Sequence, residues 1–209
     1  MSSLKQLIEG FSRFRELHFA KDDALYRDLV EQGQMPKTLV VACCDARVDP
    51  ALVLDCAPGD LFVIRNVANL VPPAENQGHY HGTSAALEFG VCKLGVEHII
   101  VLGHAHCGGI QALMEGGVKK ENTFISEWMG IVDTAHQYVQ REFADAGIEQ
   151  RQRACERQAV LVSLNNLMTF SWIRERVEQG TLTLHGWYFD IEHGQLLGYD
   201  ASSRQFEML

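Results

Sequence analysis

Two short segments of the chain combine the residue types that bind metal ions and move protons. The first, CCDAR at 43–47, offers two thiols, a carboxylate and a guanidinium. The second, GHAHCGG at 103–109, places His104 and Cys107 three residues apart in a glycine-flanked turn. Zinc binds thiolate sulfur and imidazole nitrogen, and three protein ligands with an open fourth position are typical of catalytic zinc. We therefore predict that Cys43, His104 and Cys107 hold one Zn2+ ion per chain.

Two of these ligands have a neighbour of the same type that competes for the role. Cys44 follows Cys43, but successive residues of an extended strand face opposite sides, which turns Cys44 away from the ligand side. His106 competes with His104, although it is adjacent to Cys107, and adjacent side chains would chelate one ion poorly. Cys44 and His106 therefore stay as the two rival ligands.

Asp45 and Arg47 are the carboxylate and the guanidinium that follow the first thiol. They are two residues apart, so in an extended segment their side chains share a face. A guanidinium can grip a carboxylate through two hydrogen bonds and lower its pKa. Such a pair in a loop is usually a structural ion pair. Because thiols flank this one, we predict that Arg47 orients Asp45 beside the metal.

Two apolar segments must position these residues. TLVVA at 38–42 and VEHIIVL at 96–102 have the composition of buried strands, and each leads into one of the candidate segments. Residues 82–94 between them have helical apolar spacing and are followed by a glycine. The order strand, helix, strand predicts right-handed crossovers and a parallel sheet, which binds ligands at the carboxyl ends of its strands. The two candidate segments are therefore expected to meet.

The remaining patterns place the whole chain, 1–209, in one α/β domain with three parts. These are a helical arm (1–32), a zinc-site core (34–115) and a part with helices and a C-terminal strand (124–209). The amphipathic arm packs either on its own sheet or on another subunit, and the sequence leaves both open. The other expected elements are strands at 61–64 and 181–190, an antiparallel partner strand at 195–200, and helices at 124–144 and 148–177.

Composition excludes several classes of function. The chain has 209 residues and a formal net charge of −9, and no basic patch indicates nucleic-acid binding. No run of 18 apolar residues predicts a membrane span, and the first residues lack the apolar centre of a signal peptide. The six cysteines are sparse and do not form a disulfide-scaffold pattern. We therefore expect reduced thiols and a cytoplasmic protein.

Several blocks of the sequence resemble the β-class carbonic anhydrases. Besides the two ligand segments, these are FVIRNVANLVPP at 62–73, AALEF at 85–89 and the tail LHGWYFDIEHGQLLGYD at 184–200. The resemblance implies zinc-dependent, reversible hydration of CO2 to bicarbonate and a proton by zinc-bound hydroxide. It also implies a homodimer or a higher homo-oligomer. The implied fold is a central, mostly parallel sheet, with a four-stranded core plus an extra strand, flanked by helices.

The resemblance also assigns roles residue by residue. It implies that Asp45 and Arg47 are the catalytic dyad, and in some family members the aspartate itself moves onto the metal. The implied zinc ligands are Cys43, His104 and Cys107. The residues that match the substrate pocket are Gln34, Phe62, Val67, Gly108 and Phe89, the last at a position where plant-like members tend to carry tyrosine.

Two substitutions indicate the subgroup. Bicarbonate-inhibited members carry a tryptophan where this chain has Val40, and a tyrosine where it has Phe189. Arg65 is present but is insufficient alone for that regulatory pocket. The chain therefore resembles the plant-type group that bicarbonate does not regulate.

Two other functions stay open at this point. Some β-class relatives hydrolyse carbonyl sulfide or carbon disulfide at a similar zinc site. A non-catalytic zinc-binding or redox-sensing protein is the second alternative, because the extra thiol of Cys44 beside a ligand could oxidise. The presence of Asp45, Arg47 and Gln34 favours the enzyme.

Overall fold

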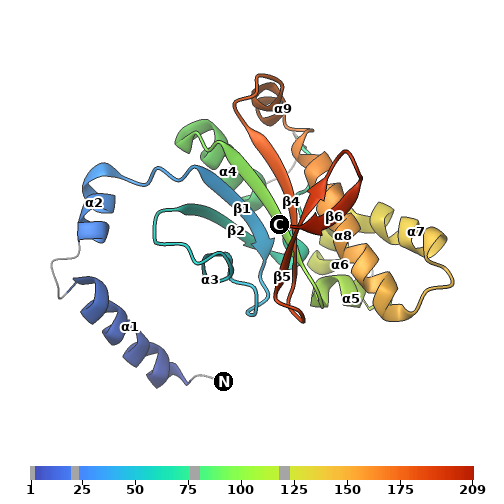
Figure 1. The fold of residues 1–209 in the computed structure, drawn as a ribbon, viewed down its shortest axis with the longest axis horizontal. Coiled ribbons are helices and arrows are strands. Elements are labelled where there is room, and N and C mark those ends of the chain that lie inside the picture. Colours follow the sequence, from blue (N-terminus) through green and yellow to red (C-terminus); the bar gives the residue numbers. More distant parts are fainter. Residues whose placement is uncertain (1–2, 20–23, 76–80, 118–122) are drawn as a thin grey trace.

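The chain folds around one six-stranded sheet with helices packed against it (Figure 1). The computed structural model describes residues 3–19, 24–75, 81–117 and 123–209. The strand order is β2-β1-β3-β4-β5-β6, in which the first four strands are parallel and the last two are antiparallel to their neighbours. The strands are β1 (Thr38–Cys43), β2 (Leu61–Asn66), β3 (His98–His104), β4 (Thr183–Asp190), β5 (Gln195–Asp200) and β6 (Gln205–Met208).

The parallel core and the antiparallel fifth strand confirm the expected fold class, whereas β6 is an additional strand that the sequence did not predict. It pairs with β5 through residues such as Tyr199 and Phe206. Its four residues alternate too briefly to stand out as a strand pattern.

The helices follow the predicted order with two interruptions. The expected helix at 124–144 is broken by a 3-10 turn at Gly130–Val132, and the expected helix at 148–177 is broken between Leu167 and Ser171. The helices are α1 (Leu4–Phe19), α2 (Ala24–Gln32), α3 (Pro50–Val53), α4 (Gly82–Glu88) with a π-helical extension (Phe89–Leu94), α5 (Gly108–Met114), α6 (Phe124–Met129), α7 (Asp133–Glu142), α8 (Ile148–Leu167) and α9 (Ser171–Glu178).

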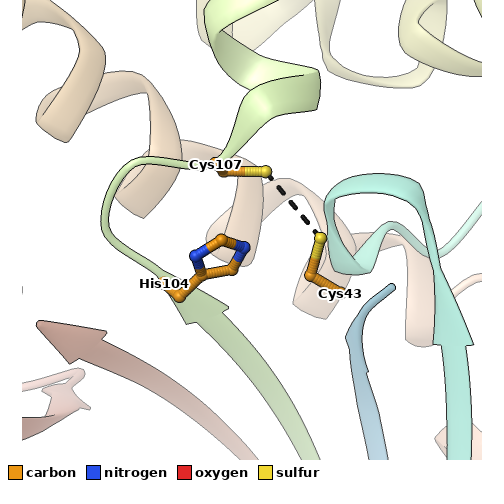
Figure 2. A group of neighbouring side chains, drawn as sticks. All are labelled: Cys43, His104 and Cys107. Atoms are coloured by element: carbon orange, nitrogen blue, oxygen red, sulfur yellow. Dashed lines mark hydrogen bonds between the residues drawn. The ribbon is translucent and has the colours of Figure 1, made fainter. Parts of the chain in front are cut away.

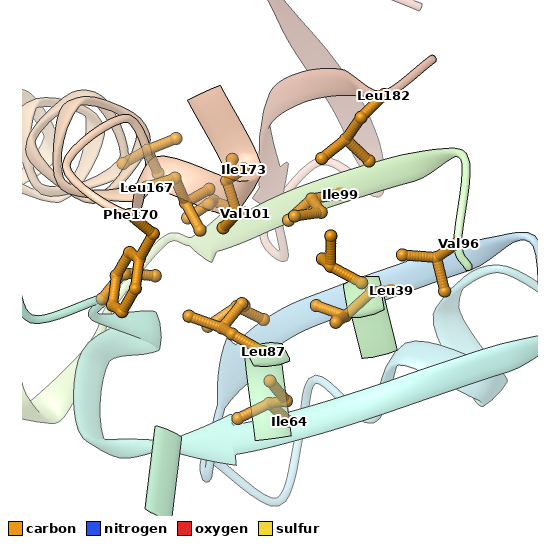
Figure 3. Packing of buried hydrophobic residues seen from close by; sticks show 14 residues of the cluster. Leu39, Ile64, Leu87, Val96, Ile99, Val101, Leu167, Phe170, Ile173 and Leu182 are labelled. Atoms are coloured by element: carbon orange, nitrogen blue, oxygen red, sulfur yellow. The ribbon is translucent and has the colours of Figure 1, made fainter. Parts of the chain in front are cut away.

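The main core lies between one face of the sheet and the helices α4, α8 and α9 (Figure 3). Alternate residues of the two central strands, such as Leu39 and Ile99, are fully buried there because the side chains of a strand point to one face at every second position. Gly103 brings α8 close to the sheet, since a Cβ atom at this position would lie 2.6 Å from the Val160 side chain. The position of α8 behind the end of β3 matters for the site described below.

The N-terminal arm does not join this core. Helix α1 has no buried residue, and Leu4, Leu7 and Phe11 on it are 62–75% exposed. Figure 1 shows α1 and α2 extending away from the sheet. Of the two placements that the sequence left open, packing of α1 on its own sheet is therefore wrong. Phe14 packs against α2, through Tyr26, whereas Leu4, Leu7 and Phe11 stay exposed.

In the described part of the chain, none of the helices combines the length and the apolar character needed to cross a lipid bilayer.

Candidate metal centre

Three side chains converge at the carboxyl ends of β1 and β3, the inner two of the four parallel strands (Figure 2). Cys43 is the last residue of β1 and His104 the last of β3, and these strands pair in parallel, with Ala42 opposite Leu102. Cys107 follows three residues later and caps the start of α5. All three side chains are buried, with 1–5% exposure. The parallel register thus brings the two predicted segments together.

The three residues fit a zinc ion. Their ligand atoms lie within 4.8 Å of one another, and the two sulfur atoms are 4.0 Å apart. Two sulfurs about 2.3 Å from one zinc at a tetrahedral angle would be about 3.8 Å apart, which agrees with this spacing. Cys44 and His106 are not part of the cluster that the described residues form, so the geometry favours the predicted ligands over both rivals.

The imidazole of His104 is already oriented for binding. Its Nδ1 atom lies 2.8 Å from the carbonyl oxygen of Ala105, and because a carbonyl only accepts, Nδ1 carries the proton. The lone pair is therefore on Nε2, which is buried and has no hydrogen-bond partner among the described residues. A buried nitrogen of this kind is costly unless something binds it. A metal ion between the two thiols would satisfy it.

The two thiols influence each other's ionisation. The hydrogen bond from Cys107 lowers the pKa of the Cys43 thiol, and the nearby His104 lowers it further. The same hydrogen bond and burial raise the pKa of Cys107. Without a cation, one thiolate therefore makes the second harder to form, whereas a bound divalent cation favours both.

Asp45 and Arg47 form a bidentate pair at the rim of this cluster. Arg47 donates from Nε to Asp45 Oδ1 at 2.9 Å and from its terminal nitrogen to Oδ2 at 2.7 Å, and its backbone N–H also reaches Oδ1 at 2.9 Å. These donors hold the pKa of the Asp45 carboxyl well below its usual range. Asp45 is therefore ionised, and its position is fixed by Arg47.

The backbone of the turn at His106 helps to hold the dyad. His106 has a left-handed φ of 58°, which is uncommon for a residue other than glycine. In this conformation its carbonyl oxygen accepts a hydrogen bond from Arg47 at 2.9 Å. The turn after β3 thus supports the dyad, which itself follows β1. Such strained residues often persist where a functional site over-determines the backbone.

Two residues that support the site were not assigned these roles from the sequence. Arg65 on β2 donates to the carbonyl oxygens of Cys43 and Asp45 at 2.9 and 2.7 Å, and so holds the loop that carries the dyad. Glu156 on α8 is 2% exposed and accepts the backbone N–H of Cys107 at 2.9 Å. Its other oxygen accepts the Tyr188 hydroxyl at 2.6 Å. The only local signal for Glu156 was an acidic residue at a position that the helix buries.

The predicted substrate residues fall into two groups. Val67 and Gly108 lie at the metal end of the sheet, where Gly108 directly follows Cys107 and Val67 packs beside Gly109. Phe62 and Phe89 stack on each other at 5.9 Å, but Phe62 is opposite Leu39 at the start of β1. Gln34 precedes β1 and is exposed. A single chain therefore does not bring these last three residues to the cysteines.

Comparison with known proteins places this geometry in context. The family model described as carbonic anhydrase matches residues 38–196. Beta carbonic anhydrase 3 of Arabidopsis thaliana is 36% identical over 93% of this chain and 76% of its own length. The structure of the β-carbonic anhydrase CcaA has a TM-score of 0.92 and 33% identity, covering 99% of this chain and 92% of that one. One of two tetrameric β-carbonic anhydrases from Sordaria macrospora has a TM-score of 0.71 and 28% identity, covering 93% and 92%.

Proposed function

Because the chain belongs to the β-carbonic anhydrase family, whose reaction is the reversible hydration of CO2, we propose that the residues above carry out this reaction. One observation carries the proposal: a buried Cys43–His104–Cys107 cluster lies beside an ionised carboxylate that an arginine holds in place. The cluster would hold one zinc ion per chain. When bound, zinc supplies a Lewis acid that lowers the pKa of a water molecule towards neutrality.

Asp45 and Arg47 have separate tasks in this proposal. Asp45 is ionised and accepts a hydrogen bond from the attacking water, which aims an oxygen lone pair at the carbon of CO2. Arg47 keeps the carboxylate ionised and away from the fourth ligand position, since it occupies both carboxylate oxygens. Asp45 is therefore a proposed ligand only in a closed state in which this pair has broken.

Val67 and Gly108 form the part of the substrate site that this chain supplies next to the cluster. Val67 is 37% exposed and offers an apolar surface to CO2. The backbone N–H of Gly108 at the start of α5 can donate to the developing bicarbonate. These two residues would position the substrate and stabilise the product.

We assign Gln34, Phe62 and Phe89 to the site of a partner copy. In this chain Phe62 is opposite Leu39, four residues or roughly 13 Å along the strand from the level of Cys43. Phe89 stacks on Phe62, and Gln34 precedes the strand. Phe89 is 46% exposed, and helix α1 of the arm leaves Leu4 and Phe11 exposed. A homodimer or a higher homo-oligomer would cover both and complete each substrate pocket. The tetrameric relatives support an assembly of this kind.

Arg65 supports membership of the plant-type group without bicarbonate regulation. Its guanidinium is already bound to the carbonyl oxygens of Cys43 and Asp45 and to the Asp49 carboxylate. A second ligand would have to break these contacts. The side chains of Val40 and Phe189 have no polar atom that could bind such a ligand. Activity that is constant with increasing bicarbonate, after correction for the reverse reaction, would support the assignment.

A cytoplasmic location is part of the proposal. Its support is that the six cysteines are free, which suits a reducing compartment. Cell fractionation with an antibody against the protein tests it, and recovery in a secreted or organelle fraction would contradict it.

The decisive experiment joins metal analysis to stopped-flow CO2 hydration on the purified protein. We expect one zinc per chain and a rate far above that of buffer. A parallel assay of carbonyl sulfide and carbon disulfide hydrolysis tests the alternative substrates. Zinc binding without any hydration or hydrolysis would instead favour a non-catalytic zinc protein.

A further inference from the structure

A pocket lies between the hairpin of β5 and β6 and helix α8, which also carries Glu156. Its volume is about 560 Å³, and its lining comes from α8, from Phe143 after α7, and from the hairpin. Three arginines line it: Arg153 and Arg157 on α8, and Arg204 in the turn between the two strands. None of its lining residues is an aspartate or a glutamate. The pocket therefore concentrates positive charge in a chain whose net charge is −9.

Two of these arginines have no acidic partner among the described residues. No ion pair joins Arg157 or Arg204 to a carboxylate, whereas Arg153 pairs with Glu192 at 2.9 Å. The Nε atom of Arg157 is buried and makes no hydrogen bond within the described chain. Its guanidinium instead stacks over the Tyr188 ring, 4.9 Å from the centroid. An unpaired cation beside a buried, unsatisfied donor fits an anionic ligand.

The rest of the pocket indicates the shape of that ligand. Phe143, Leu161 and Phe206 give it an apolar wall, and Gln150 and Gln158 add amide groups. Ligand sites commonly combine an apolar lining with a few polar groups that fix orientation. An inorganic ion would leave the apolar wall unused. The lining suits a small organic oxyanion, such as a phosphate monoester or a carboxylate, with an apolar substituent.

Arg153 connects this pocket to the dyad. Its guanidinium contacts the imidazole of His106 and pairs with Glu192, which itself lies 2.9 Å from the same His106 nitrogen. It also pairs with the buried Glu156 at 3.4 Å. The carbonyl oxygen of the same His106 accepts from Arg47, which holds Asp45. An anion in the pocket would compete with Glu192 and Glu156 for Arg153, and so would remove one of the two side chains that hold the His106 imidazole.

We propose that this pocket binds a small organic oxyanion through Arg157 and Arg204, and that the bound anion slows CO2 hydration by drawing Arg153 from His106. The binding step depends only on the pocket. The effect on the rate rests on the proposed function. The two parts therefore need separate measurements on the same zinc-loaded protein.

Calorimetry tests the binding step. Phenyl phosphate and benzoate are titrated into the zinc-loaded protein at low salt, with inorganic phosphate as the probe that lacks the apolar group. We expect one site per chain, with a lower dissociation constant for phenyl phosphate than for inorganic phosphate. Whichever of phenyl phosphate and benzoate has the lower dissociation constant identifies the preferred anionic group. Arg204→Gln should weaken binding at least about tenfold, because it removes one charged hydrogen-bond donor. Arg204→Glu should weaken it further.

The matched control is Arg174→Gln, on α9 outside the pocket, which should bind like the wild type. Arg204 is exposed, so its variants should fold, and a thermal melt checks this. Equal affinity in Arg204→Gln and wild type would overturn the site, because it would mean that the anion binds elsewhere, for example at the metal. Absence of any binding would overturn it as well.

Stopped-flow hydration with added phenyl phosphate tests the coupling. The concentration that gives half of the inhibition should equal the calorimetric dissociation constant. It should rise in Arg204→Gln by the same factor as that constant. An unchanged value in Arg204→Gln, or binding without any change in rate, would overturn the coupling. A protein without hydration activity would contradict the proposed function, while calorimetry would still decide whether the pocket binds an anion.

Discussion

The two ends of β1 differ in how completely one chain builds them. At the carboxyl end, Cys43, His104 and Cys107 are buried, and hydrogen bonds from Arg65 and to Glu156 fix the backbone around them. At the amino end, Gln34 and Phe89 are exposed, and the arm has no buried residue on α1. The difference supports the proposal that one chain builds the metal site by itself, whereas the complete substrate pocket needs the assembly.

The largest effect should come from breaking the carboxyl end. Cys107→Ser removes one of two thiolates and should lose most of its zinc and nearly all of its hydration activity, because metal binding depends on the deprotonated sulfur. Metal analysis of the dialysed protein measures this. Cys44→Ser is the matched control, since Cys44 is exposed and outside the cluster, and it should keep its zinc. Loss of zinc from the control would make Cys44 the ligand.

Asp45→Asn should separate metal binding from catalysis at the same end. The variant should keep its zinc, because the three ligands are unchanged. Its hydration rate should fall on the order of 10²-fold, the effect of losing a positioned catalytic group. Stopped-flow hydration together with zinc analysis checks both statements. A variant with the wild-type rate would remove Asp45 from the mechanism.

A change at the amino end should alter assembly and leave the zinc content unchanged, the opposite of the change at the carboxyl end. Deletion of residues 1–20 removes α1 and should weaken oligomerisation, while the single-chain cluster keeps its zinc. If partner copies complete each substrate pocket, the monomeric form should also lose activity, by about tenfold or more. Light scattering, metal analysis and stopped-flow hydration are measured on one preparation. A stable monomer with full activity would show that one chain is sufficient.

A mixing experiment sharpens this comparison. Asp45→Asn and Gln34→Ala subunits are each impaired, and they are refolded together. If Gln34 serves the partner's site, a mixed dimer has one doubly damaged site and one intact site, so activity returns. If Gln34 serves its own chain, every site keeps one defect and no activity returns.

The sequence predicts the features that local motifs determine, but not those that depend on contacts between distant parts of the chain or between copies. The clustering of Cys43, His104 and Cys107 was predictable, because two local motifs each end a strand and parallel pairing brings strand ends together. The role of Glu156 was not, since the contact with Cys107 spans 49 positions and depends on how closely α8 packs behind Gly103. The short β6 strand and the break at Gly130 lack a distinct periodic pattern. The motifs also indicate pocket residues without showing whether each belongs to the site of its own chain or of a partner copy.

Arg47→Ala should have a smaller effect, a loss of unfolding free energy whose size depends on pH. Arg47 lowers the pKa of Asp45 in the folded state from its ordinary value of 3.8. The stabilisation is therefore fully present above pH 3.8 and disappears as the pH falls through the lower folded value. The difference in unfolding free energy between wild type and Arg47→Ala should be constant from pH 5 to 8 and shrink in more acidic buffer. Urea titrations at a series of pH values measure it. A difference that grows on acidification would contradict the assignment.

The smallest effect should come from the support beneath the metal centre. The Tyr188 side chain is fully buried, and burial raises the pKa of its hydroxyl, so the hydroxyl stays protonated and donates to Glu156. Tyr188→Phe keeps the ring over which Arg157 stacks but removes this donor. The carboxylate keeps its bonds from the Cys107 amide and Gln152. The lost hydrogen bond should cost about 0.5–1.5 kcal/mol of unfolding free energy, the typical net contribution of one such bond.

Denaturant unfolding of the zinc-loaded protein measures that cost. Tyr138→Phe is the matched control, because Tyr138 is 38% exposed and its hydroxyl makes no hydrogen bond within the described residues; its stability should change by less than about 0.5 kcal/mol. Zinc content and hydration should stay close to wild type in both variants, since the Tyr188 hydroxyl is bonded to Glu156 and not to a proposed metal ligand. A loss of zinc in Tyr188→Phe would mean that Glu156 needs this donor to hold the Cys107 amide in place. The metal end would then depend on its buried support as strongly as on its ligands.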